Sequence, residues 1–189
     1  MSDPQADARA AAAQMGRPLA GRSRVVSRCG LALPVVLEVE PDVEGRPFPT
    51  LYYLTCPLAR ARVARLEADR GVARLQARAE EEDEFGAALA AANAAYARAR
   101  AARVPAGSPV GALLRGGVGG AVGGVKCLHA HYAHTRAGGV NPIGAEVAAA
   151  VEPLACERPC VVDGARDPRW REPAQGAPDP GSPRPEAAP

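Results

Sequence analysis

The sequence predicts an α+β protein, in which a three-stranded antiparallel meander packs against several helices and a disordered C-terminal tail follows. Three observations predict this fold. Apolar and polar residues alternate between residues 24 and 57, alanine-rich helical stretches follow that segment, and Pro, Gly, Ala and charged residues dominate after residue 162. The length of 189 residues fits one domain with tails.

The expected domain organisation is a single α+β domain over residues 23–162, preceded by an N-terminal helix and flexible lead-in over 1–22. Residues 163–189 have too little apolar area to offset the entropy of ordering, so we expect a disordered Pro/Gly-rich tail. A Gly-rich loop over 104–124 is expected to be mobile. It does not match the phosphate-binding loop pattern, because Val125 separates Gly124 from Lys126, and a flexible linker is the better interpretation.

The individual elements follow from local signals. Asp3 before Pro4 predicts the start of a helix over residues 4–15. Alternating residues predict strands around 24–29, 34–40 and 48–55, with turns at 30–34 and 42–47. Helices are predicted over about 57–69, through a second stretch that holds Val72 and Leu75, from about 80 to 103, over about 125–136 and up to about Val151.

Two cysteines end strands of the predicted meander. Strands one and three of a meander run in the same direction, so Cys29 and Cys56 should lie along one edge of the sheet. The middle strand would separate them by roughly 5 Å per strand spacing.

The composition of the chain limits which binding partners and which cellular compartment we expect. The net charge of +2, from 23 basic and 21 acidic residues, does not favour binding to nucleic acid or to an anionic membrane. The sequence shows no signal-peptide pattern and no apolar run of membrane-spanning length, so we expect a cytoplasmic protein. Five cysteines are an odd number, and cytoplasmic thiols stay reduced, so thiol chemistry or metal binding is expected rather than a set of disulfides.

The stretch from Lys126 to His134 concentrates metal-binding residue types. On a helix, Cys127, His131 and His134 stand at i, i+4 and i+7 and fall within about 60° of one another. His129 would point to the other side, although first-turn geometry is loose. Zinc or ferrous iron would suit such ligands, and the thiolate favours zinc.

Tetrahedral zinc needs four ligands, and several sets of four are open. We expect the site among Cys56, Cys127, His129, His131 and His134, with Cys29, Cys156 and Cys160 as weaker candidates. No regular zinc-finger spacing is present.

Two alternatives compete with a metal site. Cys127 is also a candidate catalytic nucleophile, because a neighbouring imidazolium, Lys126 and a helix N-terminus would all lower a thiol pKa. The cysteines and histidines could instead be ordinary core residues, since cysteine is among the most buried residue types.

Four phrases of the sequence resemble a known bacterial family, the domain of unknown function 501. They are Arg28-Cys29 with Gly30 and Pro34, the run 47–57, the run 125–134 and the run 141–144, within a resemblance over about residues 12–162. The resemblance implies no established activity. It implies that Cys127, His129 and His134 belong to the family pattern and that His131 is less typical, which conflicts with the helical-wheel choice.

The sequence therefore gives three hypotheses for function. The first is a cytoplasmic protein with a Cys/His transition-metal site of zinc type, in which Cys127 and His134 are core ligands, and Cys56 and either His129 or His131 complete the set. The second is a metal- or thiol-dependent enzyme acting on a small anionic substrate. The third is a partner-binding module for cell division or the cell envelope, which the gene neighbourhood of the resembling family suggests. The reaction, the substrate, the metal and the oligomeric state do not follow from the sequence.

Overall fold

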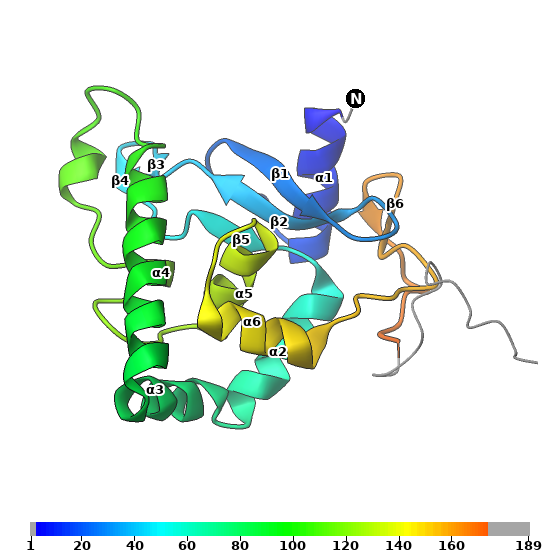
Figure 1. Cartoon of the computed structure of the whole chain (residues 1–189). Helices are drawn as coiled ribbons and strands as arrows, with labels where there is room; N and C mark the ends of the chain where they lie inside the picture. Colours follow the sequence, from blue (N-terminus) through cyan, green and yellow to red (C-terminus); the bar gives the residue numbers. More distant parts are fainter. Residues whose placement is uncertain (1–2, 174–189) are drawn as a thin grey trace, which may run out of the picture.

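A computed structural model describes residues 3–173 and confirms the predicted fold class. Its main sheet has the order β1-β2-β5, formed by β1 (Ser23–Arg28), β2 (Pro34–Val39) and β5 (Tyr52–Leu54) (Figure 1). Both pairings are antiparallel, with Val25 opposite Leu37 and Val36 opposite Leu54. The predicted meander is therefore confirmed, and a short hairpin of β3 (Asp42–Val43) and β4 (Arg46–Pro47) occupies its second connection.

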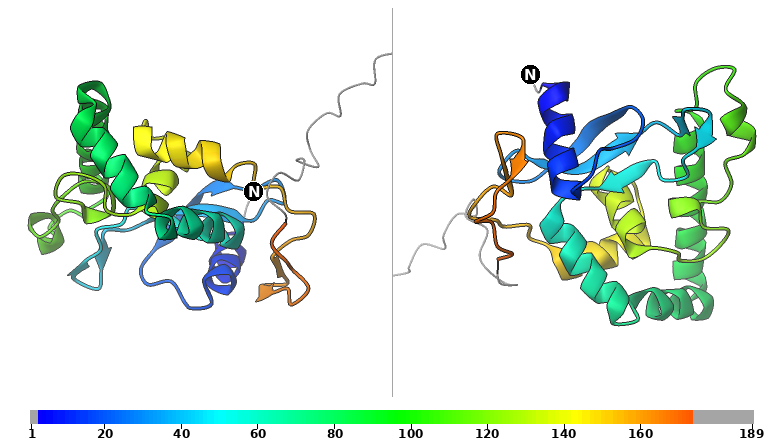
Figure 2. Two further views of the ribbon diagram at one scale, coloured as in Figure 1. Left: turned by 90° about the horizontal axis from the view of Figure 1, so that it is seen from below. Right: turned by 180° about the vertical axis from the view of Figure 1, so that it is seen from behind.

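Helices cover both faces of the sheet, so every residue of β2 is buried. Helix α1 (Pro4–Met15) lies on one face, and α5 (Leu128–Arg136) lies on the other (Figure 2). Leu37 and Val39 pack with Ala11 of α1, whereas Val36 and Leu54 belong to the main core with α5. Burying a Val or Leu side chain contributes roughly 1.5 to 3 kcal/mol, so β2 anchors both halves of the molecule.

Helix α1 belongs to the same packed body as the sheet. Asp3 caps its start by accepting a hydrogen bond from the backbone of Gln5 at 2.9 Å, as predicted, and Gly16 ends it in the left-handed conformation. Gln14 is only 3% exposed, and its Nε2 donates to the Pro34 carbonyl at 3.0 Å. The helix is thus fastened to the start of β2.

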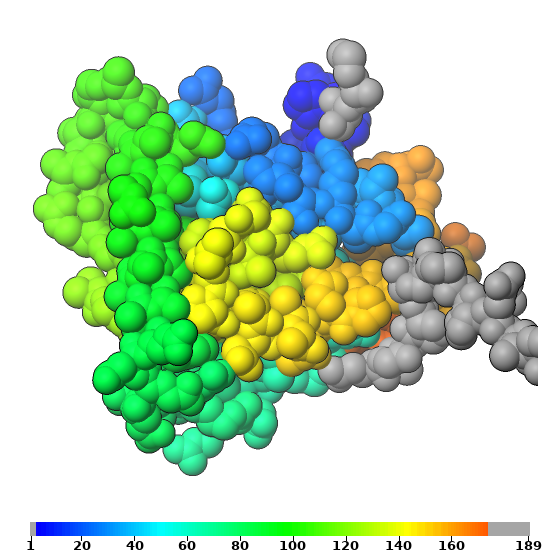
Figure 3. All heavy atoms as spheres, in the orientation of Figure 1, coloured from blue at the N-terminus to red at the C-terminus, as the bar shows by residue number. Residues whose placement is uncertain are grey.

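The remaining helices frame α5. Helices α2 (Pro57–Ala68), α3 (Gly71–Glu81) and α4 (Asp83–Ala101) follow one another around the lower and outer side of the molecule (Figure 1). Helix α6 (Pro142–Val151) packs beside α5 and lies at the surface between α4 and the sheet (Figure 3). The start of α5 therefore meets α2, and its middle is enclosed by the sheet and α6.

The Gly-rich loop makes several hydrogen bonds to α4. It contains two short 3-10 turns, η1 (Pro109–Ala112) and η2 (Val118–Gly120). The guanidinium of Arg100, which is 3% exposed, donates to the carbonyl groups of Gly116 at 2.6 Å and Arg115 at 3.1 Å. Asn93 Oδ1 accepts from the backbone of Val118 at 2.9 Å. These bonds fix the loop against α4.

The segment after α6 continues the structure beyond residue 162. A hairpin of β6 (Val161–Val162) and β7 (Ala165–Arg166) is followed by Asp167, which is 6% exposed, and by Trp170, which packs against two apolar clusters. Residues 163–173 thus have a described conformation, to which the one tryptophan of the chain contributes an apolar anchor. The rest of the predicted tail, residues 174–189, lies outside the described residues.

Candidate metal centre

Three side chains of metal-binding types converge where α2 meets α5. Glu67 lies near the end of α2, Cys127 is the N-cap of α5, and His129 lies in the first turn of α5. One ligand atom from each lies within 4.8 Å of the other two, and all three side chains are partly exposed. Two of these residues were expected to be ligands, and Glu67 was not.

The local backbone explains why Cys127 reaches α2. Its φ of −154° and ψ of 119° are extended, so the residue precedes the helix and does not follow the helical wheel. The next residue, Leu128, donates its backbone N-H to Glu67 Oε1 at 2.7 Å. A carboxylate at a helix N-terminus is favoured by the helix dipole. Glu67 therefore fastens the start of α5 to α2 and places its own carboxylate beside the thiol.

The ring of His129 is oriented by a backbone group. Its Nε2 lies 3.2 Å from the carbonyl oxygen of Arg60, and its Nδ1 lies 3.2 Å from Glu67 Oε1. Both ring nitrogens therefore face oxygen acceptors. When Nε2 donates to Arg60, the lone pair of Nδ1 faces the carboxylate, and a metal ion can lie between the two. Metal-binding histidines commonly have such a second partner, which fixes the tautomer.

A cavity of about 380 Å³ adjoins the cluster. Cys127 and His129 line it on one side, and Tyr52, Tyr53 and Arg60 contribute to the rest of its wall. A small molecule in this cavity would therefore contact two of the three clustered residues and a guanidinium. Such a concave site with few polar groups is the usual form of a ligand pocket.

The thiol of Cys127 is not activated in this environment. Burial raises its pKa above the ordinary value, and the negative charge of Glu67 raises it further. The backbone N-H groups of Ala130 and His129 act in the opposite direction but do not reverse the shift. The expectation that the helix N-terminus and neighbouring cations would lower this pKa is therefore wrong, and a nucleophilic thiolate is not favoured.

The other two histidines of α5 are bound to one asparagine in the core. Asn141 Oδ1 accepts from the backbone of Gly144 at 2.9 Å and so caps α6. Its Nδ2 lies 3.2 Å from His134 Nδ1, and its Nδ2 and Oδ1 both lie near His131 Nδ1, at 3.0 and 3.1 Å. One amide therefore holds both rings through their Nδ1 atoms.

Burial keeps these two rings neutral. It lowers the pKa of His131 to about 4, against a smaller opposing effect of Asn141, and it lowers the pKa of His134 as well. The His134 ring also stacks on Tyr52, with ring centroids 5.8 Å apart, and meets Tyr96 edge to face. His131 Nε2 is buried and finds no partner within residues 3–173.

The expected convergence of Cys127, His131 and His134 is therefore absent from the described part of the chain. In both buried histidines, Nδ1 is engaged by Asn141, and neither ring belongs to the group of clustered ligand atoms. The helical wheel placed the three residues on one stripe, but Cys127 stands outside the helix. The structure groups Cys127 with His129 instead.

The remaining cysteines lie apart from the Glu67 cluster. Cys56 caps the start of α2 and is 5% exposed, and burial raises the pKa of its thiol to about 12. It lies with Cys29 at the end of the sheet where β1 and β5 finish, as the meander predicted. None of the weaker candidates, Cys29, Cys156 and Cys160, belongs to the three-residue group.

Comparison with known proteins gives a family and no function. No curated protein and no solved structure matches the chain. Among the described residues, no helix has the length and apolar character to cross a membrane. A family model described as "Protein of unknown function (DUF501)" matches residues 25–149, a range that includes Glu67, Cys127, His129 and Asn141. The chain therefore belongs to the DUF501 family of proteins of unknown function.

Proposed function

We propose that this protein binds a divalent transition metal of zinc type through Glu67, Cys127 and His129. The observation that carries the proposal is the convergence of three ligand atoms within 4.8 Å from two helices that are about sixty residues apart in the sequence. When Nε2 of His129 carries the ring proton, Nδ1 and Glu67 Oε1 face each other with lone pairs, and a cation between them removes a repulsion. The cysteine and histidine part of this set was predicted from the sequence.

The donor set suits zinc in type and charge. Carboxylate oxygen, thiolate sulfur and imidazole nitrogen are the three ligand types that zinc takes in proteins. One carboxylate and one thiolate balance the charge of a divalent ion, while neutral His129 adds none. Thiolate is a softer ligand than magnesium or calcium accepts, so it selects zinc or a related transition metal. Metal binding would also remove the thiol proton that burial retains.

A fourth coordination position would remain open toward the cavity. Three protein ligands with one open position are typical of catalytic zinc sites, whereas four closed ligands are typical of structural ones. Arg60 lines the same cavity and supplies a positive charge next to it. We therefore infer that the ligand of this site is a small anionic molecule, which Arg60 would orient while the metal polarises it. A cytoplasmic location and a protein partner stay predictions from the sequence.

The competing explanation is a purely structural ion pair. In that case Glu67 caps α5 and pairs with a protonated His129, and no metal is involved. Glu67→Gln separates the two, because glutamine keeps an oxygen that accepts from Leu128 but loses the anionic ligand. Glu146→Gln is the matched control, since Glu146 lies on α6 and its exposed carboxylate pairs with Arg78 at 2.8 Å.

The experiment is a zinc titration of the full-length protein in competition with a chromophoric chelator. Loss of a residue that only hydrogen-bonds to a metal ligand weakens metal binding by about 10- to 100-fold. We expect Glu67→Gln and His129→Ala, which remove ligands themselves, to weaken binding of one zinc ion by more than this. Glu146→Gln should bind as the wild type does. Wild-type affinity in both Glu67→Gln and His129→Ala would overturn the proposal.

A further inference from the structure

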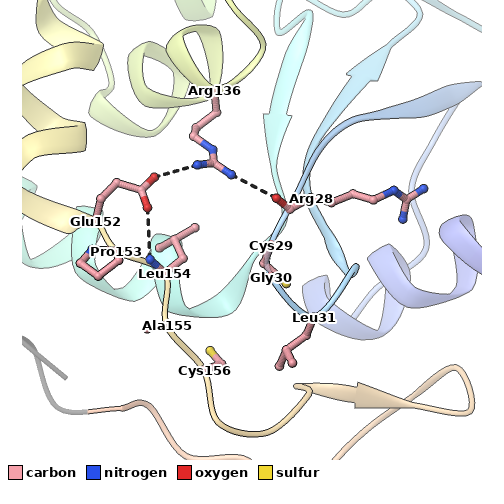
Figure 4. Close-up of a pocket in the computed structure, with 10 residues that line it drawn as sticks. All are labelled: Arg28, Cys29, Gly30, Leu31, Arg136, Glu152, Pro153, Leu154, Ala155 and Cys156. Carbon is pink, nitrogen blue, oxygen red and sulfur yellow. Dashed lines mark hydrogen bonds and ion pairs between the residues drawn. The ribbon is translucent and has the colours of Figure 1, made fainter. Parts of the chain in front are cut away.

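The other four cysteines come from three segments of the chain that pack near the end of β1 and the start of α2. Cys29 follows β1, Cys56 begins α2, and Cys156 and Cys160 lie in the segment after α6. Cys29 and Cys156 line the same cavity of about 350 Å³ (Figure 4). Both also pack against the core cluster that contains Cys56. All four are free thiols.

Contacts and charge effects show that the four belong to one group. Trp170 packs against the cluster of Cys56 and against the cluster of Cys160, so it joins the two. A negative charge on Cys29 would raise the pKa of Cys56, Cys156 and Cys160, and a charge on Cys160 would raise that of Cys56 and Cys156. The backbone also brings them together at the start of β2, because Cys29 N donates to the Leu33 carbonyl at 3.0 Å and Cys56 N to the Val35 carbonyl at 3.4 Å. Gln14 Nε2 lies 3.0 Å from the Pro34 carbonyl oxygen and 3.5 Å from Cys160 Sγ.

From this grouping we propose that Cys29, Cys56, Cys156 and Cys160 form a second, closed zinc site that is distinct from the site at Glu67. Zinc would replace the proton of each thiol, so one Zn²⁺ and four neutral thiols give a tetrathiolate complex of charge −2 and four released protons. Among the described residues no three of these sulfurs lie within 4.8 Å of one another. The ion would draw them together, and Cys156 and Cys160 lie outside any helix or strand, so their backbone can follow.

Burial raises the pKa of Cys56, Cys156 and Cys160, but several N-H donors face the sulfurs. Gln14 Nε2 lies 3.5 Å from Cys160 Sγ as a donor. The backbone N-H groups of Ala59 and Leu58 at the start of α2 stabilise a negative charge on Cys56. N-H donors to the sulfur are the usual outer partners of thiolate ligands.

Three arginines supply the positive charge that such a complex needs. Arg28, Arg62 and Arg166 interact electrostatically with Cys29, Cys156 and Cys160 respectively. Arg62 is 4% exposed and its Nη1 donates to the carbonyl groups of Val151 and Pro153, so it is fixed beside the segment that carries Cys156. A complex of charge −2 would be stabilised by these cations in a partly buried setting.

This second site would be structural. It has four protein ligands and no open position, which is typical of sites that hold segments together. The segments it would join are the end of β1, the start of α2 and the chain after α6. It would thereby fasten residues 154–173 to the domain, which their own short hairpin does little to achieve.

The test compares two matched cysteine variants of the full-length protein, purified with zinc in the medium and analysed for metal content. Cys127→Ser removes a ligand of the first site, and Cys160→Ser removes one of the second. We expect Cys127→Ser to retain the zinc ion of the second site, about one per chain. Cys160→Ser is expected to lose the zinc ion of the second site. Because the variants address different sites, failure of one proposal does not imply failure of the other.

A second measurement covers the case in which Cys160→Ser fails to fold. Replacing zinc by Co²⁺ in Cys127→Ser should give the visible bands of a tetrahedral ion together with intense thiolate-to-cobalt charge transfer, and a mercurial reagent should release the metal as it consumes four thiols. Absence of zinc and cobalt from Cys127→Ser would overturn the proposal. So would full metal retention in a folded Cys160→Ser, or a disulfide among these cysteines in the purified protein.

Discussion

The two ends of α5 carry the same residue type in opposite settings. At its start, His129 is partly exposed, faces a carboxylate and borders a cavity. In its middle and at its end, His131 and His134 are buried and share the amide of Asn141. The difference shows that the role of a histidine depends on the groups that surround its ring nitrogens, either other metal-binding side chains or the polar groups of the core.

The largest effect is expected from removing the amide that the buried histidines share. Asn141→Ala loses the cap of α6 and leaves two buried Nδ1 atoms without their hydrogen-bond partner, so we expect a loss of about 3 to 4 kcal/mol in the free energy of unfolding. Urea denaturation measures it. Zinc affinity at the first site should remain unchanged.

The matched control for this variant is Asn93→Ala, since Asn93 Oδ1 accepts a single bond from the backbone of Val118. Its cost should be about 1 kcal/mol. Equal costs for the two variants would contradict the role given to Asn141.

The next effect tests how closely α6 packs on the buried end. A Cβ added to Gly144 would lie 2.1 Å from Thr135 Oγ1 and 2.4 Å from the backbone oxygen of His131. Because the second neighbour is backbone, Gly144→Ala should cost about 1 to 3 kcal/mol in thermal or urea unfolding. Gly30→Ala is the control, because nothing lies within 4 Å of its added Cβ. A neutral Gly144→Ala would show that α5 and α6 separate easily.

The contrast between the two ends explains what the sequence could and could not predict. Alternation in β2 and the Asn141-Pro142 start of α6 are local signals, and both elements form where they were expected. The ligand set depended on where Cys127 points, and the helical wheel failed because that residue is an extended N-cap. Glu67 gave no local signal, since it joins the site only through the packing of α2 on α5.

Two further differences have the same origin. Arg100 donates hydrogen bonds to backbone carbonyl groups of the Gly-rich loop. Every residue has such a carbonyl group, so the sequence gives no sign of this contact. The conformation of residues 163–173 depends on Trp170. The prediction for this segment used its overall composition, in which one tryptophan has little weight. Both features rest on contacts between segments that are distant in the sequence.

Acid should lower the stability of the protein through protonation of His134 at the buried end of α5. Burial lowers its pKa below the ordinary value of 6.5, so between the two values the unfolded chain binds a proton that the folded chain does not. Stability should therefore decrease as the pH falls below about 6.5. Urea denaturation of metal-free protein at several pH values measures this, and His134→Gln should show a shallower decrease. An identical pH dependence in the variant would show that His134 does not titrate in this way.

The smallest effect on stability is expected at the exposed end. Glu67→Gln keeps an acceptor for Leu128, so the metal-free protein should lose at most about 1 kcal/mol in the free energy of unfolding. The same variant is expected to show a large loss of zinc affinity. A loss of stability comparable to that of Asn141→Ala would mean that Glu67 is a core residue, and the distinction between the two ends would fail.

The most direct test follows the ring nitrogens of the three histidines by long-range ¹H-¹⁵N correlation spectroscopy while zinc is added to the wild-type protein. The account predicts that His129 Nδ1 moves to a metal-bound shift, while the ring nitrogens of His131 and His134 keep the shifts of the zinc-free protein. A zinc-dependent change at His131 or His134 without one at His129, or no change at any of the three, would contradict it.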